Sequence, residues 1–312
     1  MEEKKRRGRP ILITGAHRSG STWVGQMVAK SPEVCYIFEP FNKDFGPGVC
    51  RAVFDTWFPY VTRENEGPYR RCIAEILDYK FHSFKELLLI RTKSQARLWL
   101  ENFYRLHMAR IKKQRILFKD PIAFFSAPWL AEVFDFQVVV LIRHPAAFAG
   151  SLKRLKWHFP FHDLLKQPLL IEGPLHPFKE EIAGAAQGSP DIIEQAALLW
   201  KIIYTRTLAY RQEYPGWIFM RHEDISFDPT GKFKSLYESL GLTFTPGIDR
   251  DIREYSAGSN PKERPDGQAT FLKRDSKENI AGWKKHMLPG DVERVRQITG
   301  EAAAYFYAES EW

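Results

Sequence analysis

The sequence predicts an α/β fold in which helices cover both faces of a central, mostly parallel, P-loop-like sheet. Two observations support this prediction. Short apolar runs rich in β-branched residues alternate with longer helical patterns, and a glycine-containing loop joins the first such run to the first helical pattern. Alternating strands and helices favour a parallel sheet that is buried on both faces. Ligands of such sheets bind at the carboxyl ends of the strands, so we expect the functional residues there.

The first three elements can be placed from short stretches. Residues 11–14, ILIT, predict a buried strand because the apolar run is followed at once by glycine. Residues 20–30, GSTWVGQMVAK, predict the helix after it, and the following SPEV ends that helix. Residues 34–38, VCYIF, predict a second strand that breaks at Glu39-Pro40.

The remaining elements continue the alternation. Further strands are expected at residues 115–119, 136–142 and 216–220, and helices at residues 94–113, 128–135 and 191–214. Residues 157–190 and 243–270 show no clean period and are rich in Pro, Gly, His and aromatic residues. We expect residues 157–190 to form a lid or binding loop, with a plain surface excursion as the alternative.

Length and charge bound the domain organisation. A chain of 312 residues with 44% hydrophobic residues can bury a large core, and we expect a single domain over residues 10–312, with two smaller domains as the alternative. The basic residues 1–9 predict a disordered tip, although a targeting patch would have the same composition. The net charge of +8 favours anionic ligands without naming them.

The chain also lacks several signals. Its three cysteines have no CxxC spacing, which favours a reducing, cytoplasmic location over a disulfide framework or a zinc site. No run of about 18 apolar residues is present, so we expect no membrane span and no secretory signal.

The loop between the first strand and helix has the spacing of a phosphate-binding loop. Gly15 and Gly20 are separated by four residues and are followed by Ser21 and Thr22. Backbone N–H groups at such a helix start bind anions, and the two hydroxyls can add donors. A simple glycine turn before a helix is the competing interpretation.

This loop departs from those of ATPases and GTPases. Ser21 stands where their lysine contacts the β and γ phosphates, and Arg143 follows the strand after which a Mg²⁺-binding aspartate would stand. These replacements suggest that arginine neutralises the anion and that no metal is required. They count against a P-loop kinase, which we keep as an alternative.

With Arg18 inside the turn, the stretch HRSGSTW resembles the 5′-phosphosulfate loop of sulfotransferases that use 3′-phosphoadenosine 5′-phosphosulfate (PAPS). The resemblance implies that Arg18, Ser19, Gly20, Ser21 and Thr22 hold the phosphosulfate and that Trp23 stacks on adenine. Ordinary core packing is the alternative for Trp23. The motif style is closest to carbohydrate-type and bacterial sulfotransferases.

Later segments extend the resemblance. Residues 136–154, FQVVVLIRHPAAFAGSLKR, are similar to the family's 3′-phosphate motif. The resemblance implies that Arg143 and Ser151 bind that phosphate. His144 stands where the family usually has an acidic residue. In residues 218–242, IFMRHEDISFDPTGKFKSLYESLGL, His222 stands at the position of the family's adenine-contacting tyrosine. Residues 271–287, FLKRDSKENIAGWKKHM, resemble the family's C-terminal basic loop, where Arg274 could contact the 3′-phosphate. Residues 118–122, FKDPI, resemble a Lys-Asp-Pro segment of related enzymes.

The resemblance implies transfer of a sulfuryl group from PAPS to a hydroxyl, with 3′-phosphoadenosine 5′-phosphate (PAP) as product. Arg18 would stabilise the leaving group, and Glu39 is the first candidate for the base. Glu39 could instead pair with an arginine, and His17, His158 and His162 are weaker candidates.

We expect a carbohydrate-like or other small-molecule or glycolipid alcohol as acceptor. The aromatic residues of the expected lid could stack on it: Trp157, Phe159, Phe161 and Phe178. A non-enzymatic nucleotide-binding or nucleic-acid-binding protein is the remaining alternative, because of the positive charge. We expect no nucleic-acid partner, and the oligomeric state is left open.

Overall fold

The computed structural model describes residues 8–43, 50, 52, 54–80, 90, 92–188, 190–261, 273 and 275–312. Five strands form a mostly parallel sheet in the order β2-β3-β1-β4-β5, which confirms the predicted fold class. They are β1 (Ile11–Gly15), β2 (Val34–Phe38), β3 (Arg115–Lys119), β4 (Gln137–Ile142) and β5 (Ile218–Arg221). Each coincides with a predicted strand to within two residues at either end.

The chain falls into two compact units. The first contains residues up to Thr14 and Val24–Val139, and the second contains Gly15–Trp23 and Val140–Trp312. A single domain over residues 10–312 therefore stays a prediction, and residues 1–7 of the expected disordered tip lie outside the described part. Each unit is described by itself below.

In the first unit, β1 and β2 both pair with β3 in parallel, with Ile11 opposite Leu117 and Val34 opposite Arg115. All five residues of β1 are buried, as expected for a strand covered on both faces. The helices of this unit are α3 (Gly67–Leu77), α5 (Lys93–Lys112), the short η1 (Ile122–Phe124) and α6 (Ala127–Phe134). The helix α2 (Ser21–Val28) begins in the second unit and continues in the first.

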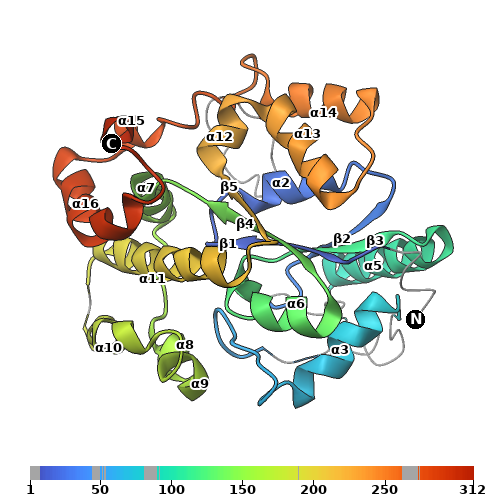
Figure 1. Cartoon of the computed structure of the whole chain (residues 1–312), viewed down its shortest axis with the longest axis horizontal. Helices are drawn as coiled ribbons and strands as arrows, with labels where there is room; N and C mark the ends of the chain where they lie inside the picture. Colours follow the sequence, from blue (N-terminus) through green and yellow to red (C-terminus); the bar gives the residue numbers. More distant parts are fainter. Residues whose placement is uncertain are drawn as a thin grey trace. The chain divides into compact units, whose positions relative to one another are not determined.

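In the second unit, the long helix α11 (Ile192–Glu213) packs against both α7 (Pro145–Leu155) and α16 (Pro289–Ala303), as Figure 1 shows in yellow, green and red. Trp200 and Tyr204 of α11 are fully buried. The indole N–H of Trp200 donates to the carbonyl of Arg143 (2.8 Å), which ties the end of β4 to this helix. This unit also contains α12 (His222–Phe227), α13 (Pro229–Leu240), α15 (Trp283–His286) and η3 (Glu309–Glu311).

The two segments without a clean period contain more helix than the sequence suggested. Residues 157–190 form α8 (His162–Leu165), α9 (Pro168–Ile171), η2 (His176–Phe178) and α10 (Lys179–Gln187), and residues 243–270 include α14 (Pro246–Ser256). The expectation of irregular structure was wrong: α8, α9 and η2 are too short to show a 3.6-residue period, whereas α10 and α14 span 9 and 11 residues. Phe159, Phe161 and Phe178 are buried, so these three aromatic residues pack inside the unit.

The thiols of Cys50 and Cys72 lie together in the first unit, with their sulfur atoms 2.9 Å apart. The spacing of the cysteines in the sequence did not indicate this neighbourhood, because the two residues are 22 positions apart. Cys35 is buried in β2. Among the described helices, none is both long enough and apolar enough to span a bilayer.

Candidate active site

The loop after β1 is shaped by residues with positive φ angles. Gly15 has φ +130°, Arg18 +65° and Gly20 +95°. A Cβ atom on Gly15 would lie 2.4 Å from the carbonyl oxygen of Leu141, and one on Gly20 would lie 2.6 Å from Nδ1 of His222. Both glycines are therefore needed for the close approach of neighbouring groups. Arg18 adopts the same region without being glycine, which is uncommon and typical of functional loops.

The loop motif and the motif after β4 meet at Arg18. The Nε atom of Arg18 donates to the hydroxyl oxygen of Ser151 (3.2 Å), and Nη1 of Arg143 donates to the carbonyl oxygen of Arg18 (2.5 Å). All three residues belong to the second unit. Two motifs more than 120 positions apart thus place two guanidinium groups and a hydroxyl at the start of α2, where the helix dipole also favours an anion.

The donors of this cluster suit an anionic ligand. Burial lowers the pKa of Arg143, and the nearby carboxylate of Glu223 opposes that shift. Within the described chain, Nε of Arg143 and Oγ of Ser19 are buried and have no hydrogen-bond partner. Buried polar groups are normally paired, so these atoms indicate a place where a ligand oxygen or water completes the network. The site therefore fits a phosphate-containing molecule.

His144 takes a helix-capping role at the point where the resembling family has an acidic residue. Its Nδ1 atom accepts a hydrogen bond from the backbone N–H of Ala146 (3.3 Å) at the start of α7. The ring stacks on Trp283, with centroids 4.9 Å apart. Burial lowers the pKa of His144 to about 3, so the ring stays neutral and keeps its acceptor. The backbone N–H of His144 donates to Glu223 (2.9 Å), which fixes the residue next to Arg143.

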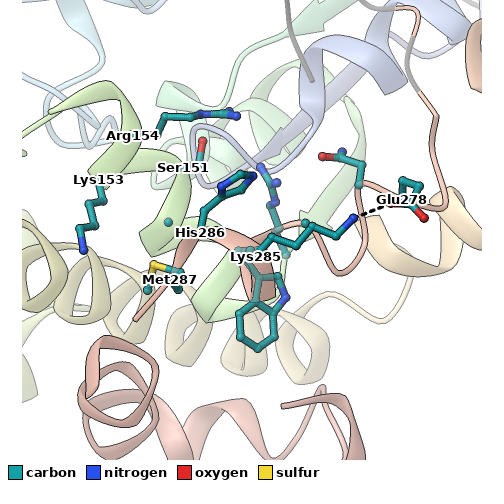
Figure 2. A pocket seen from close by; sticks show the side chains of 13 residues that line it. Ser151, Lys153, Arg154, Glu278, Lys285, His286 and Met287 are labelled. Carbon is teal, nitrogen blue, oxygen red and sulfur yellow. Dashed lines mark hydrogen bonds and ion pairs between the residues drawn. The ribbon is translucent and has the colours of Figure 1, made fainter. Parts of the chain in front are cut away.

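A cavity of about 390 Å³ opens beside Ser151, between α7 and residues 278–287 (Figure 2). Figure 2 shows Ser151, Arg154 and His286 close together, while Lys285 extends to Glu278 and Lys153 points away from them. Lys285 pairs with Glu278 at 2.9 Å. Four of the five charged residues that line this cavity are Lys or Arg, which favours an anionic ligand.

The approach of α15 to α7 depends on a small residue. A Cβ atom on Gly150 would lie 3.1 Å from Cγ and Sδ of Met287, so any larger side chain would press on the segment that carries Lys285 and His286. Sequence reasoning missed Arg154, Lys285 and His286. Arg154 could have been found, because it is three positions after Ser151 and so lies on the same helix face. Arg274, which the sequence analysis proposed, lies outside the described residues.

Trp23 and His222 lie next to each other beside the loop. Their ring centroids are 5.9 Å apart in an edge arrangement, and Trp23 also contacts Phe233 at 5.4 Å. His222 is buried, and its Nε2 atom is 3.3 Å from the side-chain nitrogen of Asn279, which lines the cavity. Trp23 thus has both core contacts and a position at the site.

Glu39 lies in the first unit and forms an ion pair with Lys119. Its other carboxylate oxygen accepts a hydrogen bond from the side chain of Asn42 (2.7 Å), and its backbone has a positive φ of +41°. The sequence analysis had considered an arginine as the partner, whereas the structure places a lysine there. Lys119 is 1% exposed and its ammonium group lies 3.7 Å from the ring centre of Phe38, so the carboxylate is held by a rigid, buried cation.

Gly25 and Asp120 are neighbours of the ion pair between Glu39 and Lys119. Gly25 lies so close that a Cβ atom there would be 2.8 Å from Cγ of Lys119 and 3.1 Å from the Tyr36 ring. Asp120 is buried and accepts hydrogen bonds from three backbone N–H groups, those of Phe41, Ile122 and Ala123. Burial, together with the negative charge of Glu39, raises the pKa of Asp120 to about 8.

The histidine alternatives for the base are weaker in the structure. His17 is buried against Phe148 and Trp157, and burial together with Arg18 lowers its pKa to about 3. His158 and His162 are exposed. In the described ranges, no three metal-binding side chains lie together.

Comparison with known proteins shows which family, relatives and solved structures this chain resembles. Residues 10–169 match the model of the sulfotransferase family. The chain is 23% identical to carbohydrate sulfotransferase 4 of Mus musculus over 97% of its own length and 82% of that protein, and 22% identical to carbohydrate sulfotransferase 5 of Mus musculus over 94% and 78%. A solved structure of the sulfotransferase domain of the Synechococcus PCC 7002 olefin synthase shares the fold, with a TM-score of 0.50, 15% identity and 96% of each chain covered.

Proposed function

This chain belongs to the sulfotransferase family, and we propose that it transfers a sulfuryl group from PAPS to a hydroxyl of a carbohydrate-like acceptor. Sulfuryl transfer follows from the family itself. The residue roles and the acceptor are the proposed part. The observation that carries them is the convergence of Arg18, Arg143 and Ser151 beside a basic cavity.

We assign the two ends of the donor to two groups of residues. When bound, PAPS supplies a sulfuryl group on a phosphate leaving group and carries a second phosphate at the 3′ position. The loop N–H groups, Ser21 and Thr22, with the guanidinium of Arg18, would neutralise the 5′ end. Arg143 and Ser151 would bind the 3′-phosphate, with the basic residues of the cavity behind them.

Trp23 and His222 would contact the adenine. Their edge contact beside the loop is compatible with a base placed against either ring. The family resemblance supports this role, and the orphaned hydroxyl of Ser19 supports an anion nearby.

We propose that Glu39 accepts the proton of the acceptor hydroxyl and that Lys119 positions its carboxylate. The ion pair and the hydrogen bond from Asn42 hold two oxygen atoms of Glu39 in fixed directions. A fixed carboxylate is suited to general-base catalysis, because the base must lie within hydrogen-bond reach of the proton.

The proposed acceptor rests on the names of the relatives and on the Glu39-Pro40 segment. Both mouse relatives are carbohydrate sulfotransferases, and the sequence resembles carbohydrate-type and bacterial members in motif style. Another small-molecule or glycolipid alcohol is the second candidate. A cytoplasmic location stays a prediction.

A thermal-shift titration with PAP in EDTA tests the donor site. Saturation at about one hundred times the dissociation constant should add about 2.7 kcal/mol to the free energy of unfolding and raise the melting temperature without metal. The same titration with ATP, and an assay for phosphoryl transfer with ATP and Mg²⁺, should give no comparable response. A protein that ignores PAP but binds ATP would contradict the assignment of the site.

Binding of nucleic acid can be distinguished from binding of PAP by its salt dependence and by mutation of Arg18. Affinity for nucleic acid should fall steeply with salt and survive the loss of Arg18, whereas PAP affinity should fall when Arg18 is replaced. A chain that binds DNA or RNA equally well with and without Arg18, and binds no PAP, would support the non-enzymatic alternative.

A further inference from the structure

Helix α5 presents a cluster of exposed apolar side chains. Leu100 is 58% exposed, Phe103 41%, Tyr104 66% and Ile111 62%. Ten large hydrophobic residues are exposed in the described chain, and four of them lie on this one helix. Exposed hydrophobic residues normally occur singly, so a cluster of four indicates a surface with a partner.

Leu100, Tyr104 and Ile111 lie on the face of α5 that is opposite its core contacts, whereas Phe103 lies nearer to Leu106 and stacks on Trp99 and His107. Leu106 and Ala109 are fully buried, and the helix packs beside β2, where Arg105 donates to the carbonyl of Tyr36 (3.1 Å). Leu100, Tyr104 and Ile111 are spaced by four and seven positions, which places them on one face of an α-helix. We call this face the outer face of α5. Its exposed apolar side chains stand beside the exposed polar residues Arg97 and His107, and the core interactions of the helix are made on the other side.

Basic residues surround the outer face. Residues 93–113 contain six basic residues and a single acidic one, Glu101, which pairs with Arg97 at 2.8 Å. Lys93, Arg110 and Lys112 are exposed. Apolar and aromatic side chains bordered by Lys and Arg are typical of helices that lie in the interface of an anionic membrane.

We propose that the outer face of α5 docks on an anionic membrane surface. Leu100, Tyr104 and Ile111 would enter the headgroup region, and Arg110 and Lys112 would contact lipid phosphates. A second copy of the chain is a poorer partner for this face, because the same positive charges would be brought together. The proposal does not depend on which hydroxyl the enzyme sulfates, nor on the residues assigned to PAPS.

Vesicle flotation of the full chain tests the proposal. The protein should float with phosphatidylcholine vesicles that contain about one third phosphatidylglycerol, should not float with pure phosphatidylcholine, and should be released by salt. Replacing the apolar residues by Leu100→Ser, Tyr104→Ser and Ile111→Ser should lower the bound fraction about tenfold or more. The matched control combines Phe227→Ser, Leu288→Ser and Tyr305→Ser, which are 68%, 64% and 69% exposed elsewhere, and should bind as the wild type does.

A charge variant keeps the test decisive if the apolar variant folds poorly. Arg110→Glu with Lys112→Glu leaves the apolar side chains in place and should also weaken binding to the anionic vesicles about tenfold. PAP-dependent thermal stabilisation should be unchanged in every variant, which separates this proposal from the donor site. Three results would each overturn the proposal: no flotation of the wild type at low salt, equal flotation of the outer-face and control variants, or a dimer in sedimentation velocity that the Leu100, Tyr104 and Ile111 substitutions dissociate.

Discussion

Arg18 donates a hydrogen bond from Nε to the hydroxyl of Ser151 over 3.2 Å, although the two residues are 133 positions apart. This bond links the loop before α2 to the helix α7, and the carbonyl of Arg18 accepts a second bond from Arg143. The positively charged group that the loop lacks at Ser21 is thus provided from within the turn and from the end of β4. The two hydrogen bonds hold Arg18 and Arg143 at the start of α2.

Replacing Arg18 by alanine should weaken PAP binding by about 10- to 150-fold, because a hydrogen bond to a charged group contributes about 1.5–3 kcal/mol. Ser151→Ala removes a neutral partner and should cost less, about 3- to 10-fold. Isothermal titration in EDTA measures both. Arg253→Ala is the control, since Arg253 is exposed and pairs only with Asp249 among the described residues. Unchanged PAP affinity in Arg18→Ala would remove this residue from the site.

The basic wall of the cavity gives a second prediction with a neighbouring control. Arg154→Ala and Lys285→Ala should each lower PAP affinity about tenfold, and the affinity should become less sensitive to salt. Lys153→Ala should change little, because Lys153 points away from Ser151 and pairs with Asp291 at 2.5 Å (Figure 2). Arg274→Ala, measured beside them, tests the residue that only the sequence suggested. If Lys153→Ala costs as much as Arg154→Ala, the effect reflects general charge and not this cavity.

The sequence was sufficient for the elements that have strong local signals. The five strands are short apolar runs, and glycines at positions 15 and 20 mark a turn that only residues tolerant of positive φ can form. Arg143 and Ser151 could be expected at one place because a known family motif links them, and both line the cavity beside α7, while their binding role stays a prediction. Pairings without such a motif were missed. Nothing in the sequence links Lys119 to Glu39, 80 positions earlier, because an ion pair leaves no local pattern.

The chemistry of single residues was also hidden. His144 looked like the loss of an acidic residue, yet its ring nitrogen caps α7, a role that depends on a neutral imidazole held by burial. Within residues 157–190, α8, α9 and η2 are too short to give a period, so the sequence predicted a loop where the structure has helices. Lys285 lies within the segment that resembles the family's C-terminal basic loop, but the resemblance implied a role only for Arg274.

Glu39→Gln should lower kcat by about 10²- to 10⁴-fold while PAP binding is unchanged, because the amide cannot accept the proton of the acceptor hydroxyl. Lys119→Met should also lower kcat, since the carboxylate would lose the cation that holds it. Initial rates with a sugar acceptor and titration with PAP separate the two effects. Full activity of Glu39→Gln on a good acceptor would rule out this base and turn attention to His158 and His162.

The lowered pKa of His144 predicts that the folded protein loses stability in acid. Its pKa is about 3 in the folded chain and about 6.5 when unfolded, so between these values the unfolded state binds the proton and the folded state does not. The stabilisation is present above pH 6.5 and is lost as the pH falls, by about 2 kcal/mol between pH 7.5 and pH 5 for this residue. His144→Asn keeps a capping side chain but does not titrate.

Urea unfolding of the wild type and of His144→Asn at pH 7.5 and pH 5 measures how much of the loss of stability is due to His144. His17 has a similarly lowered pKa and Asp120 a raised one, but both are present in both proteins and cancel in the difference. The wild type should lose about 2 kcal/mol more than His144→Asn. Equal losses would show that His144 is not the residue responsible.

Gly20→Ala should destabilise the protein for two separable reasons. Position 20 has a φ of +95°, which strains any residue with a Cβ atom, and that atom would lie 2.6 Å from Nδ1 of His222. Gly241→Ala is the matched control, since Gly241 has a φ of +65° but no atom within 4 Å of the added Cβ. We expect about 1 kcal/mol for Gly241→Ala and about 2–4 kcal/mol for Gly20→Ala in urea unfolding.

The double variant Gly20→Ala with His222→Ala isolates the contact. Removing the imidazole should relieve the steric part, so the two substitutions together should cost less than the sum of their separate effects, by about 1 kcal/mol or more. Strict additivity would mean that the loop and α12 do not press on each other, and it would leave only the backbone strain to explain why a glycine is needed before α2.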